Sequence, residues 1–159
     1  MIDEGEKVPA ITATASDGGS INLASPGQPL VLYFYPKDDT SGCTREAQDF
    51  TALAADYGKA GVKVVGVSRD PMKKHEKFID KYSLSVPLIS DEDGAISDAF
   101  GTWVQKSMYG RKYMGMERAT FLIGAGSDCA GAAVEVRASR KATDLRTCGS
   151  PRTAMLRRP

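Results

Sequence analysis

A single thiol, Cys43, stands where the sequence could support nucleophilic chemistry. It ends the stretch YPKDDTSGC, which overlaps the apolar run PLVLYFY at 29–35. A thiol attacks only as its thiolate, so a reactive cysteine needs surroundings that stabilise negative charge. A helix that begins near Cys43 would supply unpaired amide N–H groups and the positive end of its dipole. The same position also suits an inert, small apolar residue in a first helical turn.

Three residues before Cys43 favour the reactive alternative. Thr40 carries a hydroxyl that could donate to the sulfur or to a bound oxygen. Gly42 lets the backbone pass close to a ligand because it has no Cβ. Pro36 ends the apolar run and has no backbone N–H, so it can line a pocket without adding a competing hydrogen-bond donor. The loop after a buried strand is also where α/β folds place their sites.

The other two cysteines, Cys129 and Cys148, form no CxxC pair with each other or with Cys43. Three scattered cysteines are too few for a disulfide scaffold or a four-ligand zinc site, so we expect no metal and no cofactor. The absence of CxxC also argues against a thioredoxin-like thiol-disulfide oxidoreductase. The only histidine, His75, lies in the charged run KKHEKF, which predicts a solvated helix residue.

The composition indicates one soluble domain. The chain has 159 residues, of which 42% are hydrophobic and 26% charged. Its formal net charge of +1 gives no reason to expect nucleic acid or an anionic membrane as a partner. The N-terminus lacks a basic start followed by an apolar run, and no segment reaches the roughly 20 apolar residues that span a bilayer. These features predict a cytoplasmic protein.

Alternating short elements predict an α/β fold with a central mixed sheet flanked by helices. Buried strands are expected at 29–35, 62–68 and 86–90, and helices over 43–60, from Pro71 to 82, and around AISDAFG. An N-terminal hairpin is expected around DGG, and 109–123 reads as a loop or hairpin followed by the strand ATFLI. The group Tyr109, Tyr113, Met114 and Met116 either lines a hydrophobic approach to a site or, as is more common for such a group, belongs to the core.

The segment after Gly124 differs in kind, because it has no aromatic residue and no clear period. We therefore divide the chain into a domain at 1–124 and an atypical C-terminal tail at 125–159. VEVRA could form an edge strand, but the remaining composition predicts a loose, basic extension. A frameshifted tail is the alternative explanation.

Two segments of this sequence resemble a known family. LYFYPKDDTSGCTRE is similar to the peroxidatic-cysteine segment of peroxiredoxins, whose pattern Pro-x-x-x-Thr-x-x-Cys is matched by Pro36, Thr40 and Cys43. WVQKSMYGRKYMGMERATFLI resembles the bacterioferritin comigratory protein, or Q-type, branch of these AhpC/TSA-like proteins. The resemblance implies a thioredoxin-like fold and a thiol peroxidase that reduces hydrogen peroxide and organic hydroperoxides to water and alcohols.

The resemblance also implies roles for two residues outside the Cys43 loop. Arg118 in MERATF would hold the thiolate and polarise the peroxide; without the resemblance it reads as a surface residue at the start of a strand. Glu46 would orient this arginine, or it is a first-turn helix acid favoured by the dipole. The same fold could instead serve a redox sensor or binding module without rapid turnover.

The sequence departs from the family at the resolving cysteine. The two positions that relatives use are Gln48 and a residue near Ser97. The simplest expectation is a one-Cys mechanism in which thioredoxin, glutaredoxin or glutathione attacks the Cys43 sulfenic acid. Cys129 or Cys148 in the tail is the alternative resolving thiol. The resemblance further implies a monomer.

Overall fold

A five-stranded mixed sheet forms the centre of the computed structural model, which describes residues 2, 8–124 and 133–136. Its strands lie in the order β5-β4-β3-β8-β9. Three neighbours run parallel: β3 (Leu30–Phe34), β4 (Lys63–Ser68) and β5 (Leu88–Ser90). Two antiparallel strands complete the sheet: β8 (Ala119–Ile123) and β9 (Ala133–Val136). The predicted α/β class with a mixed sheet is confirmed, and β9 coincides with most of VEVRA.

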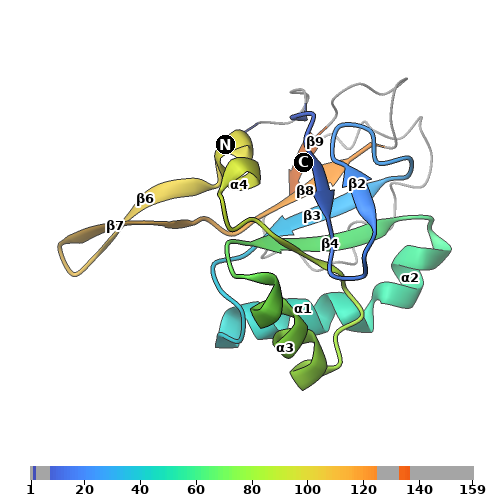
Figure 1. The fold of residues 1–159 in the computed structure, drawn as a ribbon, viewed down its shortest axis with the longest axis horizontal. Coiled ribbons are helices and arrows are strands. Elements are labelled where there is room, and N and C mark those ends of the chain that lie inside the picture. Colours follow the sequence, from blue (N-terminus) through green and yellow to red (C-terminus); the bar gives the residue numbers. More distant parts are fainter. Residues whose placement is uncertain (1, 3–7, 125–132, 137–159) are drawn as a thin grey trace, which may run out of the picture.

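Helices lie on both faces of this sheet (Figure 1). One face is covered by α1 (Ser41–Ala52), α2 (Ala54–Lys59) and α3 (Met72–Tyr82). The other carries α4 (Ala95–Phe100) and the N-terminal hairpin of β1 (Thr12–Thr14) and β2 (Ser20–Asn22). The hairpin was predicted correctly. The single helix predicted over 43–60 was wrong, because Leu53 leaves helical geometry at ψ 1° and separates α1 from α2.

Strand β3 separates two apolar cores, and this explains its unbroken apolar sequence. Leu30, Leu32 and Phe34 pack with Phe100 and Phe121 on the side of α4. The alternate residues Val31, Tyr33 and Tyr35 pack with Phe50 and Phe78 on the side of the other helices. Cys43 belongs to this second core. The thiol is therefore held by packing as well as by its helix.

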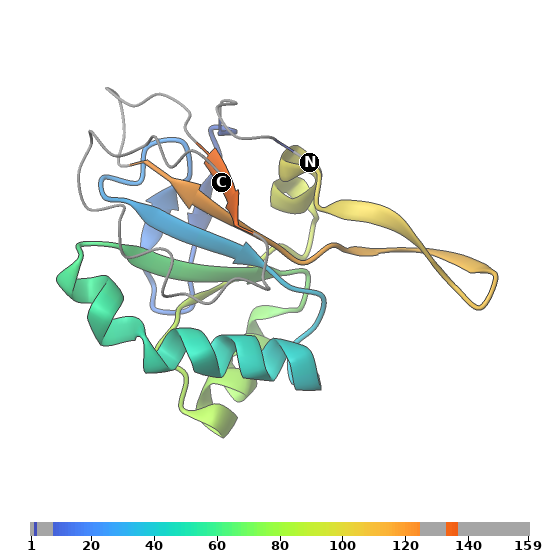
Figure 2. The ribbon, with the colours of Figure 1, turned by 180° about the vertical axis from the view of Figure 1, so that it is seen from behind.

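A second hairpin projects away from the rest of the molecule (Figure 2). It consists of β6 (Trp103–Met108) and β7 (Arg111–Met116), which pair with each other as a separate two-stranded sheet. Three of the four aromatic and methionine residues discussed above are exposed on it, namely Tyr109, Tyr113 and Met114, and only Met116 is buried. Among the described residues, no helix is long and apolar enough to cross a membrane.

Gly66 in β4 is required by the packing of Tyr33. A Cβ added at Gly66 would lie 2.6 Å from Tyr33 Cζ and 2.8 Å from Leu88 Cδ2, and both neighbours are fully buried. We expect Gly66→Ala to lower the free energy of unfolding by about 1–3 kcal/mol through overpacking, measured by urea denaturation. Gly58→Ala is the matched control, because its added Cβ meets nothing within 4 Å. Equal stability of Gly66→Ala and the wild type would contradict this account.

Candidate active site

The register of the central sheet brings together residues that are far apart in the sequence. Strands β3 and β8 are antiparallel, and Phe34 at the end of β3 pairs with Ala119 at the start of β8. Arg118 directly precedes β8, while the loop that leads to α1 directly follows β3. Both therefore emerge at the same edge of the sheet, which places Arg118 beside Cys43.

Cys43 lies in the first turn of α1, which begins at Ser41. The Thr44 amide donates to the Thr40 carbonyl at 2.8 Å and makes the first helical hydrogen bond. The amides before it belong to the turn whose N–H groups point out of a helix N-terminus, where they favour an anion. Cys43 is only 2% exposed. The predicted helix start near Cys43 is confirmed to within two residues.

Arg118 connects Cys43 to Glu46. Its Nη2 donates to Cys43 Sγ at 3.1 Å, and its Nη1 donates to Glu46 Oε1 at 2.8 Å. Burial works to lower the pKa of Arg118, but the Glu46 carboxylate and the Cys43 sulfur outweigh it and the pKa rises. The guanidinium therefore stays charged. Burial raises the pKa of Glu46, and Arg118 offsets this only in part.

The structure places the three predicted site residues that come before Cys43, namely Pro36, Thr40 and Gly42, in different surroundings. The Thr40 hydroxyl donates to the Lys37 carbonyl at 2.9 Å and not to the sulfur. A Cβ added at Gly42 would lie 3.5 Å from Arg118 Nη2, which is ordinary contact. Pro36 is exposed at the start of the loop. Of the predicted site residues, the structure brings Cys43, Arg118 and Glu46 into direct contact.

Neither usual position for a resolving thiol carries one. Gln48 is exposed on α1, and Ser97 is fully buried on α4. The Ser97 hydroxyl accepts a hydrogen bond from Arg69 Nε at 2.9 Å and donates to the Gly94 carbonyl at 3.3 Å. The predicted alternatives, Cys129 and Cys148, lie outside the described residues.

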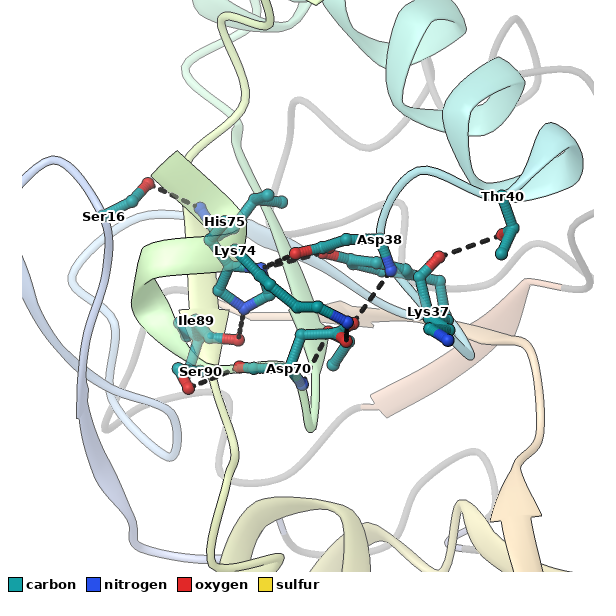
Figure 3. Close-up of polar contacts among 12 residues, drawn as sticks. Ser16, Lys37, Asp38, Thr40, Asp70, Lys74, His75, Ile89 and Ser90 are labelled. Atoms are coloured by element: carbon teal, nitrogen blue, oxygen red, sulfur yellow. Dashed lines mark hydrogen bonds and ion pairs between the residues drawn. The ribbon is translucent and has the colours of Figure 1, made fainter. Parts of the chain in front are cut away.

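The expectation for His75 was wrong, because its side chain is fully buried. Its Nδ1 lies 2.6 Å from Asp38 Oδ2, and Tyr35 donates to the other Asp38 oxygen at 2.5 Å. Figure 3 shows His75 and Asp38 beside the loop segment that carries Lys37 and Thr40. The charged neighbours of His75 face solvent, but its spacing of three and four residues from Phe78 and Ile79 is that of a buried helix face. This spacing was the available signal.

The arrangement suits chemistry at sulfur. A thiol at a helix N-terminus beside a permanently charged guanidinium is stabilised as its thiolate. The remaining forked N–H groups of such a guanidinium suit a second small oxygen ligand. Within the described part of the chain, no three His, Cys, Asp or Glu side chains are grouped so as to hold a metal ion.

Comparisons with known proteins agree with this chemistry. The family model described as AhpC/TSA family matches residues 5–127. Peroxiredoxin Bcp of Xanthomonas campestris is 45% identical over 128 residues, covering 77% of this chain and 80% of the relative. Peroxiredoxin Bcp of Bacillus subtilis is 40% identical over 123 residues, covering 77% and 78%. A structure of the Xanthomonas campestris bacterioferritin comigratory protein, described for its alkyl peroxide reduction activity, aligns with a TM-score of 0.74 at 39% identity, covering 89% and 92%.

Proposed function

Because this chain belongs to the AhpC/TSA family and is a peroxiredoxin, a thiol peroxidase with the thioredoxin-like fold, we propose that Cys43 is its peroxidatic residue. Arg118 holds the Cys43 thiolate and the peroxide, and Glu46 orients Arg118. The observation that carries this assignment is the single guanidinium that donates to Cys43 Sγ at 3.1 Å and to Glu46 Oε1 at 2.8 Å.

The first step is an in-line displacement at oxygen. The Cys43 thiolate attacks the terminal oxygen of ROOH, an S–O bond forms, and the O–O bond breaks. The sulfur is oxidised to a sulfenic acid, and the leaving RO⁻ takes up a proton to become an alcohol, or water when R is hydrogen. Arg118 and the first-turn amides of α1 stabilise the charge that develops on the leaving oxygen.

Thr40 contributes in a way that follows from its hydrogen bond. Because its hydroxyl proton is donated to the Lys37 carbonyl, its oxygen remains an acceptor. Thr40 Oγ1 accepts the O–H of the bound hydroperoxide and directs the terminal oxygen toward the sulfur. Pro36 walls the same pocket at the start of the loop, and Gly42 leaves room for Arg118.

The second step uses an external thiol. The positions of the usual resolving cysteines are occupied by Gln48, which is exposed, and by Ser97, which is buried and whose hydroxyl makes two hydrogen bonds. A thiol of thioredoxin, glutaredoxin or glutathione displaces water from the Cys43 sulfenic acid to give a mixed disulfide. A second thiol then releases Cys43. The alkyl peroxide reduction described for the Xanthomonas protein supports organic hydroperoxides as substrates beside hydrogen peroxide.

Trapping the oxidised protein tests the one-Cys mechanism. After one equivalent of hydroperoxide without reductant, we expect dimedone to label Cys43 nearly stoichiometrically, measured by peptide mass spectrometry. The matched variant Gln48→Cys places a thiol on the exposed face of α1. Two cysteines five residues apart in an intact helix lie beyond the roughly 7 Å Cα separation that a disulfide spans, so we expect the first turns of α1 to unwind, a disulfide between Cys43 and the introduced thiol to form, and the label to be lost. A disulfide from Cys43 to Cys129 or Cys148 in the wild type would show instead that the tail supplies the resolving thiol.

A further inference from the structure

The loop that presents Cys43 is anchored from behind by a buried cluster of Tyr35, Asp38 and His75. We propose that Asp38 and His75 are positioning residues whose buried contact holds Thr40 and Cys43 in the geometry needed for attack. This inference rests on the proposed role of Cys43 and adds the residues on which its placement depends.

Two contacts from different elements hold the ring of His75. Its Nδ1 lies 2.6 Å from Asp38 Oδ2, and its Nε2 lies 3.0 Å from the Ile89 carbonyl oxygen. Both ring nitrogens therefore lie within hydrogen-bond distance of an oxygen, one in the reactive loop and one in β5. Because the ring is fully buried, these two contacts fix its position and that of the Asp38 side chain.

The rest of the cluster completes the pair. Burial, with a further contribution from the Asp38 carboxylate, raises the pKa of Tyr35 far above its usual range, so its hydroxyl keeps the proton that it donates to Asp38 Oδ1. Beneath this pair, Asp70 Oδ2 accepts from the Asp38 amide at 2.8 Å and from Ser68 Oγ at 2.7 Å (Figure 3). Lys74 Nζ lies 3.6 Å from the other Asp70 oxygen.

These contacts bear directly on the reactive loop. Asp38 is 6% exposed and lies two residues before Thr40, the N-cap of α1. Its side chain is bound to α3 through His75, and its amide is bound to the end of β4 through Asp70. Release of Asp38 would free the chain that sets the start of α1. Small displacements of a reacting group can cost up to about 100-fold in rate.

A second, exposed anchor on the same loop provides a natural comparison. Asp39 pairs with Lys81 at 2.8 Å and accepts from the Tyr82 hydroxyl at 2.5 Å. Both members of this ion pair are largely exposed, and such pairs contribute little because solvent screens them. Asp39 also has a positive φ of 58°, which asparagine tolerates well. Asp39→Asn therefore removes one charge from the loop without removing the buried cluster.

The test compares Asp38→Ala, Asp38→Asn and Asp39→Asn with the wild type. Two quantities are measured on folded protein: kcat/KM for hydroperoxide, and the midpoint of the Cys43 thiolate absorbance titration, taken as a difference from Cys43→Ser. We expect Asp38→Ala to lower kcat/KM by about 10- to 100-fold and to move the midpoint to higher pH. Asp39→Asn should leave both quantities unchanged.

Asp38→Asn is a conservative variant that should fold more readily than Asp38→Ala and restore the lost hydrogen bonds. Its amide can accept from Tyr35 and donate to Nδ1 of a neutral His75, whose Nε2–H still reaches Ile89. We expect its activity to stay within about threefold of the wild type, because the hydrogen-bonded geometry is kept. Wild-type values in Asp38→Ala, or equal impairment of Asp38→Asn and Asp38→Ala, would overturn the positioning role. The titration reports on Cys43 even in a protein that turns over no peroxide, so it separates this inference from the peroxidase assignment.

Discussion

Replacing Cys43 with serine is expected to abolish rapid peroxide consumption, with a loss of about four orders of magnitude or more in kcat/KM. A serine hydroxyl is not ionised at neutral pH and is a weak nucleophile toward oxygen, whereas a thiolate beside Arg118 is a strong one. Stopped-flow measurement of peroxide loss with excess reductant gives the rate directly. The small change at a buried site leaves the packing of α1 against β3 nearly intact, so lost activity should not reflect unfolding.

The matched control for this substitution is the double variant Cys129→Ser/Cys148→Ser. It removes both other thiols of the chain, and we expect it to consume the first equivalent of peroxide at the wild-type rate. A slow wild type that matches Cys43→Ser would refute the assignment of Cys43. If the wild type consumes peroxide rapidly and the double variant does so slowly, a cysteine of the tail is needed for the first step.

Arg118→Ala is expected to give the second largest effect, a loss of about 100- to 1,000-fold in kcat/KM. The alanine removes the Nη2 donor at 3.1 Å from Cys43 Sγ and leaves Glu46, which is partly buried, without its ion-pair partner. The thiolate then loses its nearest positive charge, and the leaving oxygen loses a donor. The rate of Cys43 alkylation by iodoacetamide is measured across a pH series. In this variant we expect the rise of that rate to occur at higher pH than in the wild type.

Two further variants separate charge from geometry at this site. Arg118→Lys keeps the charge, but one ammonium cannot copy the fork that reaches both Cys43 and Glu46, so we expect an intermediate loss of about tenfold. Glu46→Gln keeps an acceptor for Nη1 and should cost less than Arg118→Ala. Wild-type kinetics in Arg118→Ala would show that this contact has no catalytic role.

Local structure around Cys43 could be predicted because it depends on nearby residues. The apolar run 29–35 predicts β3, and the helical spacing after Cys43 predicts α1 to within two residues at its start. The interruption at Leu53 could not be predicted, because the apolar period continues through it while the backbone breaks. Arg118 was found only through the resemblance to peroxiredoxins, since nothing near it in the sequence indicates a contact with Cys43.

The sequence by itself determined the candidate nucleophile, the strand, loop and helix that carry it, and the absence of cysteine at Gln48 and Ser97. These are properties of short segments, in which propensity and spacing act directly. Only the tertiary structure decided that Arg118 meets Cys43, which lies 75 positions away in the sequence, because the pairing of Phe34 with Ala119 brings the two together. It also decided that His75 is buried and in contact with Asp38, because the partners of a buried polar side chain come from other elements of the fold.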